Sequence, residues 1–94
     1  MIHPVLSEER LCELLRRVPG ATYVVAGRED GKLIAAVVSR DFANMEEIER
    51  QSLVWGLILD NLSDGEQAQV GYVFTNTPEE RAQAEAEAAA GTGT

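Results

Sequence analysis

The side chains that could do covalent or metal chemistry are few in this 94-residue chain, which has one cysteine, Cys12, and one histidine, His3. Nucleophilic catalysis requires a nucleophile beside a base, and a zinc site requires several such ligands. Cys12 falls within an amphipathic helical pattern, which favours a small buried thiol over a reactive one. His3 precedes that pattern and has no orienting partner nearby in the sequence. We therefore predict no catalytic residue, no metal site and no cofactor, and we expect a protein that is not an enzyme.

Acidic pairs and a glycine-containing segment also have simpler explanations than chemistry. The pairs Glu8-Glu9, Glu46-Glu47 and Glu79-Glu80 each fall in the first turn of an expected helix. Carboxylates there favour the positive end of the helix dipole and serve as caps. The segment 27–31 (GREDG) carries two acidic side chains that would repel phosphate, so we interpret it as part of a hairpin turn with Asp30-Gly31 at its tip.

The charge of the chain excludes some partners and favours others. The formal net charge is −8, and no basic run is present. Nucleic acids and anionic membranes are bound largely through Lys and Arg, so neither is an expected partner. A basic protein is favoured electrostatically, although the charge has solubility as an alternative explanation. The longest strongly apolar run, residues 53–59, is too short to span a bilayer. No secretory signal is visible, and a cytoplasmic location is expected.

Hydrophobic periodicity and turn signals predict an α+β domain with the element order αββαβα. The first two strands should form a hairpin, and the nearly continuous apolar second strand should be central in a three-stranded mixed sheet. The helices should pack on one face. Asn44 is the expected cap of the long helix, Ile48 belongs to its expected apolar face, and Ser63–Glu66 is expected as a polar loop. The predicted helices span about residues 8–18, 45–61 and 78 onward, and the predicted strands span 22–26, 33–39 and 69–75.

Two sets of residues could serve the core or a partner. Trp55 on the long helix suits a core position, with a partner-binding anchor as the alternative. On the third strand, strict alternation places Val70, Tyr72 and Phe74 on one face and Val73 on the other. An exposed apolar set there would imply a partner or a dimer. We expect one domain over residues 1–80 and an Ala/Glu-rich tail, helical or frayed, over residues 81–94.

Several short motifs agree in order and spacing with a known family. The stretch 34–62 (IAAVVSRDFANMEEIERQSLVWGLILDNL) is followed by a third strand and then by TPEE at 77–80, and VPGA closes the first helix. This pattern resembles the BolA family over roughly residues 7–80. The resemblance implies a fold of the BolA, or class II KH-like, type.

The same resemblance implies a site, because the family's imidazoles and thiols share an iron–sulfur cluster with monothiol glutaredoxins. Here Gln51 stands where the family has His after the helix Arg, Asn44 where it has Gly, and Gln69 where it has the His of the third strand. The hairpin loop supplies neither His nor Cys, and Gln is a poor iron ligand. The chain therefore resembles a degenerate member that lacks the histidine ligands. Family members are also discussed as nucleic-acid binders, which the charge and the missing GxxG loop disfavour here.

The leading hypothesis is a non-catalytic, BolA-like binding or regulatory module that works through protein–protein contacts on the long helix and the third strand. Its partner would be a glutaredoxin-like or a basic protein. One alternative is an iron–sulfur-linked partner of a monothiol glutaredoxin, acting through Cys12 or His3. Another is a homodimer or higher assembly through an exposed sheet face or edge strand. The predicted partner-binding residues are Phe42, Asn44, Arg50, Gln51, Val54, Trp55 and Gln69.

Overall fold

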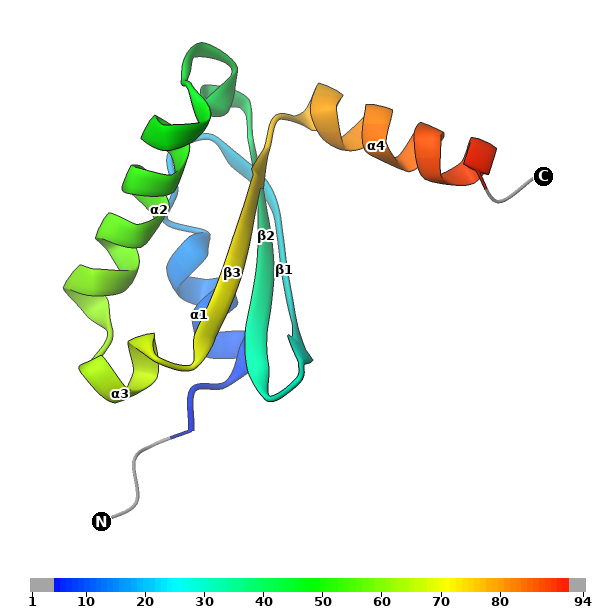
Figure 1. Ribbon diagram of the computed structural model, residues 1–94. Helices are drawn as coiled ribbons and strands as arrows, with labels where there is room; N and C mark the ends of the chain where they lie inside the picture. The colour runs from blue at the N-terminus through cyan, green and yellow to red at the C-terminus, as the bar shows by residue number, and fades with distance from the viewer. Residues whose placement is uncertain (1–4, 92–94) are drawn as a thin grey trace.

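The computed structural model of the protein describes residues 5–91 (Figure 1). The predicted order αββαβα and the α+β class are confirmed, with two short helices, η1 and α3, added between the main elements. The elements are α1 (Glu8–Leu15), β1 (Ala21–Glu29), β2 (Lys32–Ser39), η1 (Arg40–Asn44), α2 (Glu47–Asn61), α3 (Asp64–Gln67), β3 (Val70–Asn76) and α4 (Pro78–Gly91).

The sheet has the order β1-β2-β3, so β2 is the central strand as predicted. β1 and β2 are antiparallel and meet at a tight turn, where Asp30 (φ 51°) and Gly31 (φ 79°) both have positive φ. This backbone is that of a type I′ hairpin, which Asp-Gly favours. β3 lies parallel to β2, because α2 carries the chain back across one face of the sheet. The predicted mixed sheet is thus confirmed.

The first helix begins as predicted and ends earlier. The Ser7 side chain accepts a hydrogen bond from Arg10 N and caps α1. Leu6 and Leu11 on either side of the cap are both buried, as a hydrophobic staple requires. After Leu15 the chain tightens into i→i+3 turns, with Val18 N bonded to Leu15 O, instead of continuing as α-helix to Val18.

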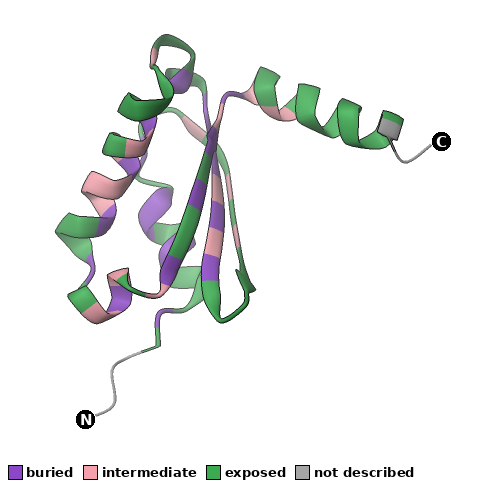
Figure 2. Cartoon of the chain, in the orientation of Figure 1, coloured by how far each residue is buried: buried purple, intermediate pink, exposed green. Residues whose placement is uncertain are grey.

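The core lies between the sheet and the two helices α1 and α2, which cover the same face of the sheet (Figure 1). Buried residues line the inner sides of these elements in Figure 2. Phe42, on η1, has no exposed surface and closes one end of this layer. The core residues are Leu6, Leu11, Leu14, Leu15, Val18, Leu33, Ala35, Val37, Phe42, Val54, Ile58, Leu62, Val70 and Val73.

Three local predictions are wrong. Asn44 lies in η1, and the N-cap of α2 is Glu46, which makes no side-chain capping bond. Ile48 is 75% exposed and does not belong to the buried face of α2. The segment after Ser63 is the short helix α3, because Ser63 and Glu66 form a capping box in which each side chain bonds the other residue's backbone N–H.

The prediction for the two faces of β3 is partly wrong. Tyr72 and Phe74 share the face away from the helices, but Val70 faces the core together with Val73. The reason is a register shift: Leu33 pairs with Val70, and the next residue, Ile34, pairs with Tyr72. Gly71 takes up the extra position, and the Lys32 Cβ lies 3.0 Å from where a Gly71 Cβ would be. A bulge of this kind reverses the alternation of side chains.

The last helix leaves the domain on the side opposite α1 and α2 (Figure 1). A capping box starts it, because Glu80 N donates to Thr77 Oγ1 and Thr77 N donates to Glu80 Oε1. Residues 82–90 are all exposed, and α4 is green along this length in Figure 2. The helix thus contacts the sheet through its first turn only. The proposed division at residue 80 stays a prediction, and residues 92–94 of the predicted tail lie outside the described residues.

Candidate functional site

The seven predicted partner-binding residues differ widely in exposure. Phe42 and Val54 are 0% exposed. Both pack in the core, so neither can contact a partner of the folded domain, and their predicted role is corrected to a structural one. Asn44 is exposed at the end of η1, whereas Gln51, Trp55 and Gln69 are half-buried.

Arg50 is also an internal residue, with only 8% of its surface exposed. Its Nε donates to Met45 O at 3.1 Å and its Nη1 donates to Thr75 O at 3.2 Å. The guanidinium also binds the Glu80 carboxylate, with Nη1 2.6 Å from Oε1, and lies over the Phe42 ring. Arg50 therefore joins α2, β3 and α4, and the predicted partner-facing role is corrected.

The Arg50–Glu80 pair shifts the titration of both groups. The hydrogen bond from Arg50 is the main cause that holds the pKa of Glu80 below its ordinary value, and the Thr77 backbone N–H adds to this effect. The hydrogen bond to Glu80 raises the pKa of Arg50. Both groups remain charged at neutral pH, so the pair acts as a fixed contact and not as a proton donor or acceptor.

Gln51 binds the free edge of β3. Its Nε2 lies 2.9 Å from Val73 O, 3.2 Å from Thr75 Oγ1 and 3.1 Å from Glu47 Oε1. Thr75 Oγ1 in turn donates to Glu47 Oε1 at 2.8 Å. The amide therefore serves the α2–β3 contact and is already engaged within the domain.

Gln69 lies at the other end of β3 and binds different partners from those of Gln51. Its Oε1 accepts a hydrogen bond from Leu6 N at 2.8 Å, and its Nε2 donates to Gly65 O at 3.2 Å. These bonds fix the segment before α1 against the loop that leads into β3. Gln51 and Gln69 thus do not form one site, and the structure does not bring the seven predicted residues together.

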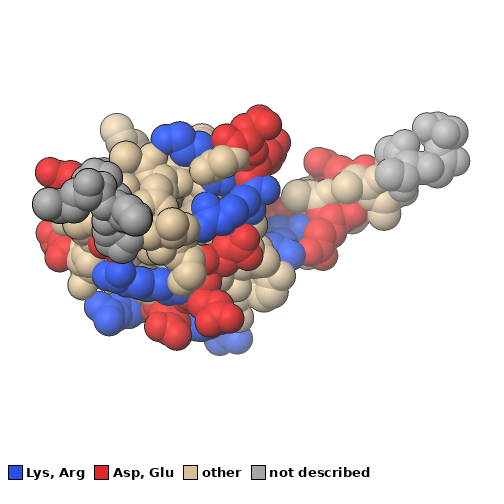
Figure 3. Space-filling view, turned by 90° about the horizontal axis from the view of Figure 1, so that it is seen from below, with Lys and Arg blue, Asp and Glu red and all other residues tan. Residues whose placement is uncertain are grey.

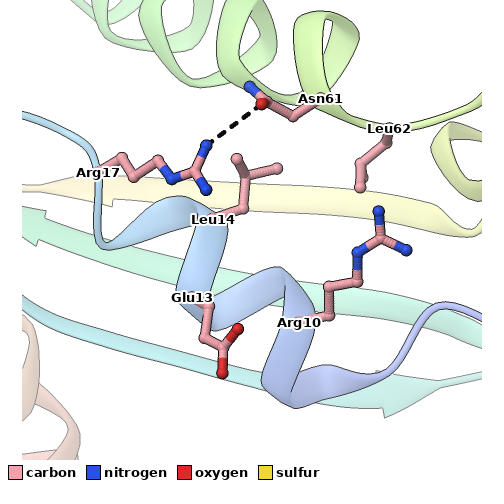
Figure 4. A pocket seen from close by; sticks show the side chains of 6 residues that line it. All are labelled: Arg10, Glu13, Leu14, Arg17, Asn61 and Leu62. Atoms are coloured by element: carbon pink, nitrogen blue, oxygen red, sulfur yellow. Dashed lines mark hydrogen bonds between the residues drawn. The ribbon is translucent and has the colours of Figure 1, made fainter.

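A cleft that the sequence did not indicate lies between α1 and the end of α2 (Figure 4). It has a volume of about 260 Å³ and is lined by Arg10, Glu13, Leu14, Arg17, Asn61 and Leu62. Both of its arginines are paired: Arg17 Nη1 donates to Asn61 Oδ1 at 3.2 Å, and Arg10 binds Glu66. The cleft contains no nucleophile, so its residues fasten α1 to α2 and α3.

Surface charge is mixed on the face shown in Figure 3, where basic side chains alternate with acidic ones and form no continuous basic patch. Among residues 5–91, no helix is long and apolar enough to cross a membrane. The α4 helix carries Glu79, Glu80, Glu85 and Glu87 against one basic residue, Arg81.

No protein-family model matches the sequence, and no curated protein matches it. Among solved structures, BolA1 from Arabidopsis thaliana superposes with a TM-score of 0.59 and 20% sequence identity, covering 78% of this chain and 93% of that one. This chain has a BolA-like fold. The α+β architecture implied by the resemblance is thereby confirmed, and the likeness at this identity concerns the fold alone.

The residues of this BolA-like chain do not fit the iron–sulfur cluster that the resemblance implies. The Gln51 amide is held by β3, and Gln69 is held by Leu6 and Gly65. Cys12 is buried on α1, where burial raises the pKa of its thiol. Within the described part of the chain, no three His, Cys, Asp or Glu side chains are grouped so as to hold a metal ion. His3 lies outside the described residues.

One surface that remains available on the BolA-like scaffold is the outer face of α2. Ile48 (75% exposed) and Leu59 (58% exposed) lie on it, with Ser52 and the half-buried Trp55 between them. These positions follow the i, i+4, i+7, i+11 spacing of one helix face. Gly56 adjoins them, and a Cβ there would meet no atom within 4 Å. We call Ile48, Ser52, Trp55, Gly56 and Leu59 the α2 stripe. The sequence pattern indicated Trp55 as a possible anchor but did not predict the exposure of Ile48 and Leu59.

Proposed function

We propose that this BolA-like protein is a non-catalytic binding module that contacts a protein partner through the α2 stripe. The observation that carries the proposal is the exposure of two large aliphatic side chains, Ile48 and Leu59, on either side of Trp55. Apolar residues in line on one helix face, with an aromatic residue at the centre, match the composition of protein interfaces.

Gly56 supports a close contact at the middle of the stripe. A glycine inside an exposed helix costs about 1 kcal/mol relative to alanine. Nothing within 4 Å in the described domain requires the absence of a side chain at this position. A partner that packs against the α2 backbone would use that space.

The non-catalytic part of the proposal rests on the state of the reactive groups. Desolvation by burial raises the pKa of the Cys12 thiol, which disfavours the thiolate that a nucleophile requires. The polar side chains expected at the site, Arg50 and Gln51, are engaged by Glu80 and by β3. We infer a regulatory, cytoplasmic role through binding, with a partner whose basic surface complements the net charge of −8.

The test is an affinity capture from a native lysate with quantitative mass spectrometry. The wild type is compared with Ile48→Ser/Leu59→Ser on α2 and with Tyr72→Ser/Phe74→Ser on the opposite side of the domain as a matched control. We expect one stoichiometric protein that is retained by the wild type and the control, is lost from the α2 variant and dissociates with added salt. Equal retention by all three would refute the α2 stripe as the contact. A monothiol glutaredoxin in the captured band would direct attention to the iron–sulfur alternative.

A further inference from the structure

Within residues 5–91, the face of the sheet opposite α1 and α2 is covered only by the first turn of α4 (Figure 1). There the Arg81 guanidinium stacks over the Tyr23 ring at 4.2 Å. The rest of this face is open, and four large side chains on it are substantially exposed. They are Tyr23 (45%), Val25 (41%), Tyr72 (52%) and Phe74 (51%).

Strand register arranges this open face in rows. One row is Val25–Ala36–Phe74, and the next is Gly27–Ile34–Tyr72. The only ionisable group in these two rows is the tyrosine hydroxyl. The largest exposed apolar patch of a soluble protein is often a functional surface.

Side chains on the open face are bulky along β3 and small along β1. On β3 the Tyr72 and Phe74 rings pack together with their centroids 4.7 Å apart. On β1 the matching positions are Gly27 and Val25, and a hollow of about 240 Å³ lies among Val25, Gly27, Ala36 and Phe74. The two aromatic rings on β3 thus lie beside a depression whose volume is comparable with that of such side chains.

We propose that the open face binds a second copy of this chain, with the two sheets face to face about a two-fold axis parallel to the strands. Such an axis places β3 of each copy over β1 of the other and keeps each row opposite the same row. Phe74 and Tyr72 of each copy then enter the depression beside Gly27 of the other. An interface between two identical patches must be self-complementary in this way.

The exposed side chains of the open face supply about half of the area that a stable dimer buries, so the proposed pair also needs contacts from α4. An aromatic side chain contributes about 150–250 Å² when fully buried, so the half-exposed rings and Val25 offer roughly 400 Å². A stable dimer buries about 800 Å² per partner. The exposed residues 82–90 of α4 leave the domain on this same side and would extend toward the other copy, supplying the remaining contact.

The effect of salt on binding distinguishes a second copy of this chain from a basic partner. Two chains of net charge −8 repel one another, and the uncharged rows provide the part of the surface where that repulsion is least. Added salt screens repulsion between like charges, so it strengthens this dimer. The same salt would weaken the attachment of a basic partner.

The experiment is sedimentation velocity on the full chain over a concentration series up to about 1 mM, at low and at moderate salt. We expect a monomer–dimer equilibrium whose dissociation constant falls with salt. Tyr72→Ser/Phe74→Ser should raise that constant at least tenfold. The matched control, Ile48→Ser/Leu59→Ser, removes exposed apolar groups from α2 and should leave it unchanged. Circular dichroism and urea unfolding of each variant verify the fold.

Gly27→Val tests the geometry and not only the hydrophobicity. A Cβ at Gly27 meets no atom within 4 Å, so the monomer accommodates the change. The added side chain fills the depression that the aromatic rings must enter, and dimerisation should weaken although the face becomes more apolar. Stronger dimerisation by Gly27→Val, equal effects of the α2 control, or a wild type that stays monomeric at every concentration would each overturn the proposal. None of these results bears on capture of a partner by the α2 stripe.

Discussion

The Arg50 guanidinium joins α2 to α4 by holding the Glu80 carboxylate with both of its terminal nitrogens, which lie 2.6 Å from Oε1 and 3.3 Å from Oε2. The same carboxylate accepts the Thr77 backbone N–H that begins α4. One residue of the last helix thus connects the helix cap to the interior of the domain.

The Arg50–Glu80 contact predicts that the neighbouring carboxylates Glu79 and Glu80 contribute differently to the free energy of unfolding. Glu80→Gln should lower the free energy of unfolding by about 1–2 kcal/mol, because charge-assisted hydrogen bonds to Arg50 are replaced by neutral ones. Glu79→Gln, one residue earlier and exposed, should change it by about 0.3 kcal/mol, the size of a helix-dipole effect. Urea unfolding followed by circular dichroism measures both, and equal losses would contradict the role assigned to the pair.

Two lowered pKa values predict weaker folding in acid. Glu80 is stabilised as the anion mainly by Arg50, and Glu66 mainly by the Ser63 backbone N–H. As the pH falls below the ordinary pKa of 4.5, the unfolded chain binds more protons at these carboxyl groups than the folded chain does. Their contribution to the free energy of unfolding is therefore fully present above that pH and is lost as the pH falls through the lowered pKa values of the folded protein.

The measurement is the urea midpoint between about pH 6 and pH 3. Glu66→Gln/Glu80→Gln should show a shallower fall than the wild type, because these two carboxylates no longer titrate. Glu49→Gln/Glu79→Gln removes the same charge from exposed positions and should follow the wild type. Parallel curves for all three proteins would exclude the two groups as the source of the acid sensitivity.

Two glycines should respond to alanine in opposite directions. Gly56→Ala should raise the free energy of unfolding by about 0.5–1 kcal/mol, because it favours helix and meets no neighbour. Gly20→Ala should lower it by more than about 1 kcal/mol, since Gly20 has φ +73° and its Cβ would lie 2.6 Å from Asp41 Oδ1. Thermal unfolding of the two variants checks the signs, and a destabilising Gly56→Ala would show that α2 needs that glycine itself.

Cys12 should react slowly with thiol reagents in the folded protein. It is 9% exposed, and desolvation by burial raises the pKa of its thiol above the ordinary value of 9.0. Labelling at neutral pH should therefore be slow, rise steadily with pH and become fast in urea, because the thiolate is the reacting form. Rapid labelling of the folded protein at neutral pH would count against a structural thiol.

Local signals in the sequence predicted most of the scaffold. Ser7, Asp30-Gly31 and the Thr77–Glu80 box act through neighbours within a few residues, so their consequences are readable along the chain. The nearly continuous apolar run over residues 33–39 predicted a central strand, and β2 lies between β1 and β3.

The site was harder to predict because its contacts are distant in sequence. Arg50 becomes internal through Glu80, thirty positions away, and Gln51 is engaged by the Val73 carbonyl and the Thr75 hydroxyl of β3. The bulge at Gly71 reverses the inward and outward positions of β3, and alternation alone cannot locate it. Ile48 lies on the helix face that it shares with Ser52, Trp55 and Leu59, whereas the buried residues of α2 are Arg50, Val54 and Ile58.

The bonds from α2 to β3 have a consequence for how the protein behaves when concentrated. β3 is an edge strand, and such a strand normally offers its backbone carbonyls to any passing chain. Here Gln51 occupies the Val73 carbonyl and Arg50 occupies the Thr75 carbonyl. A strand from another molecule would have to displace both side chains before it could pair with β3. The β3 edge is therefore protected from the growth of fibrils.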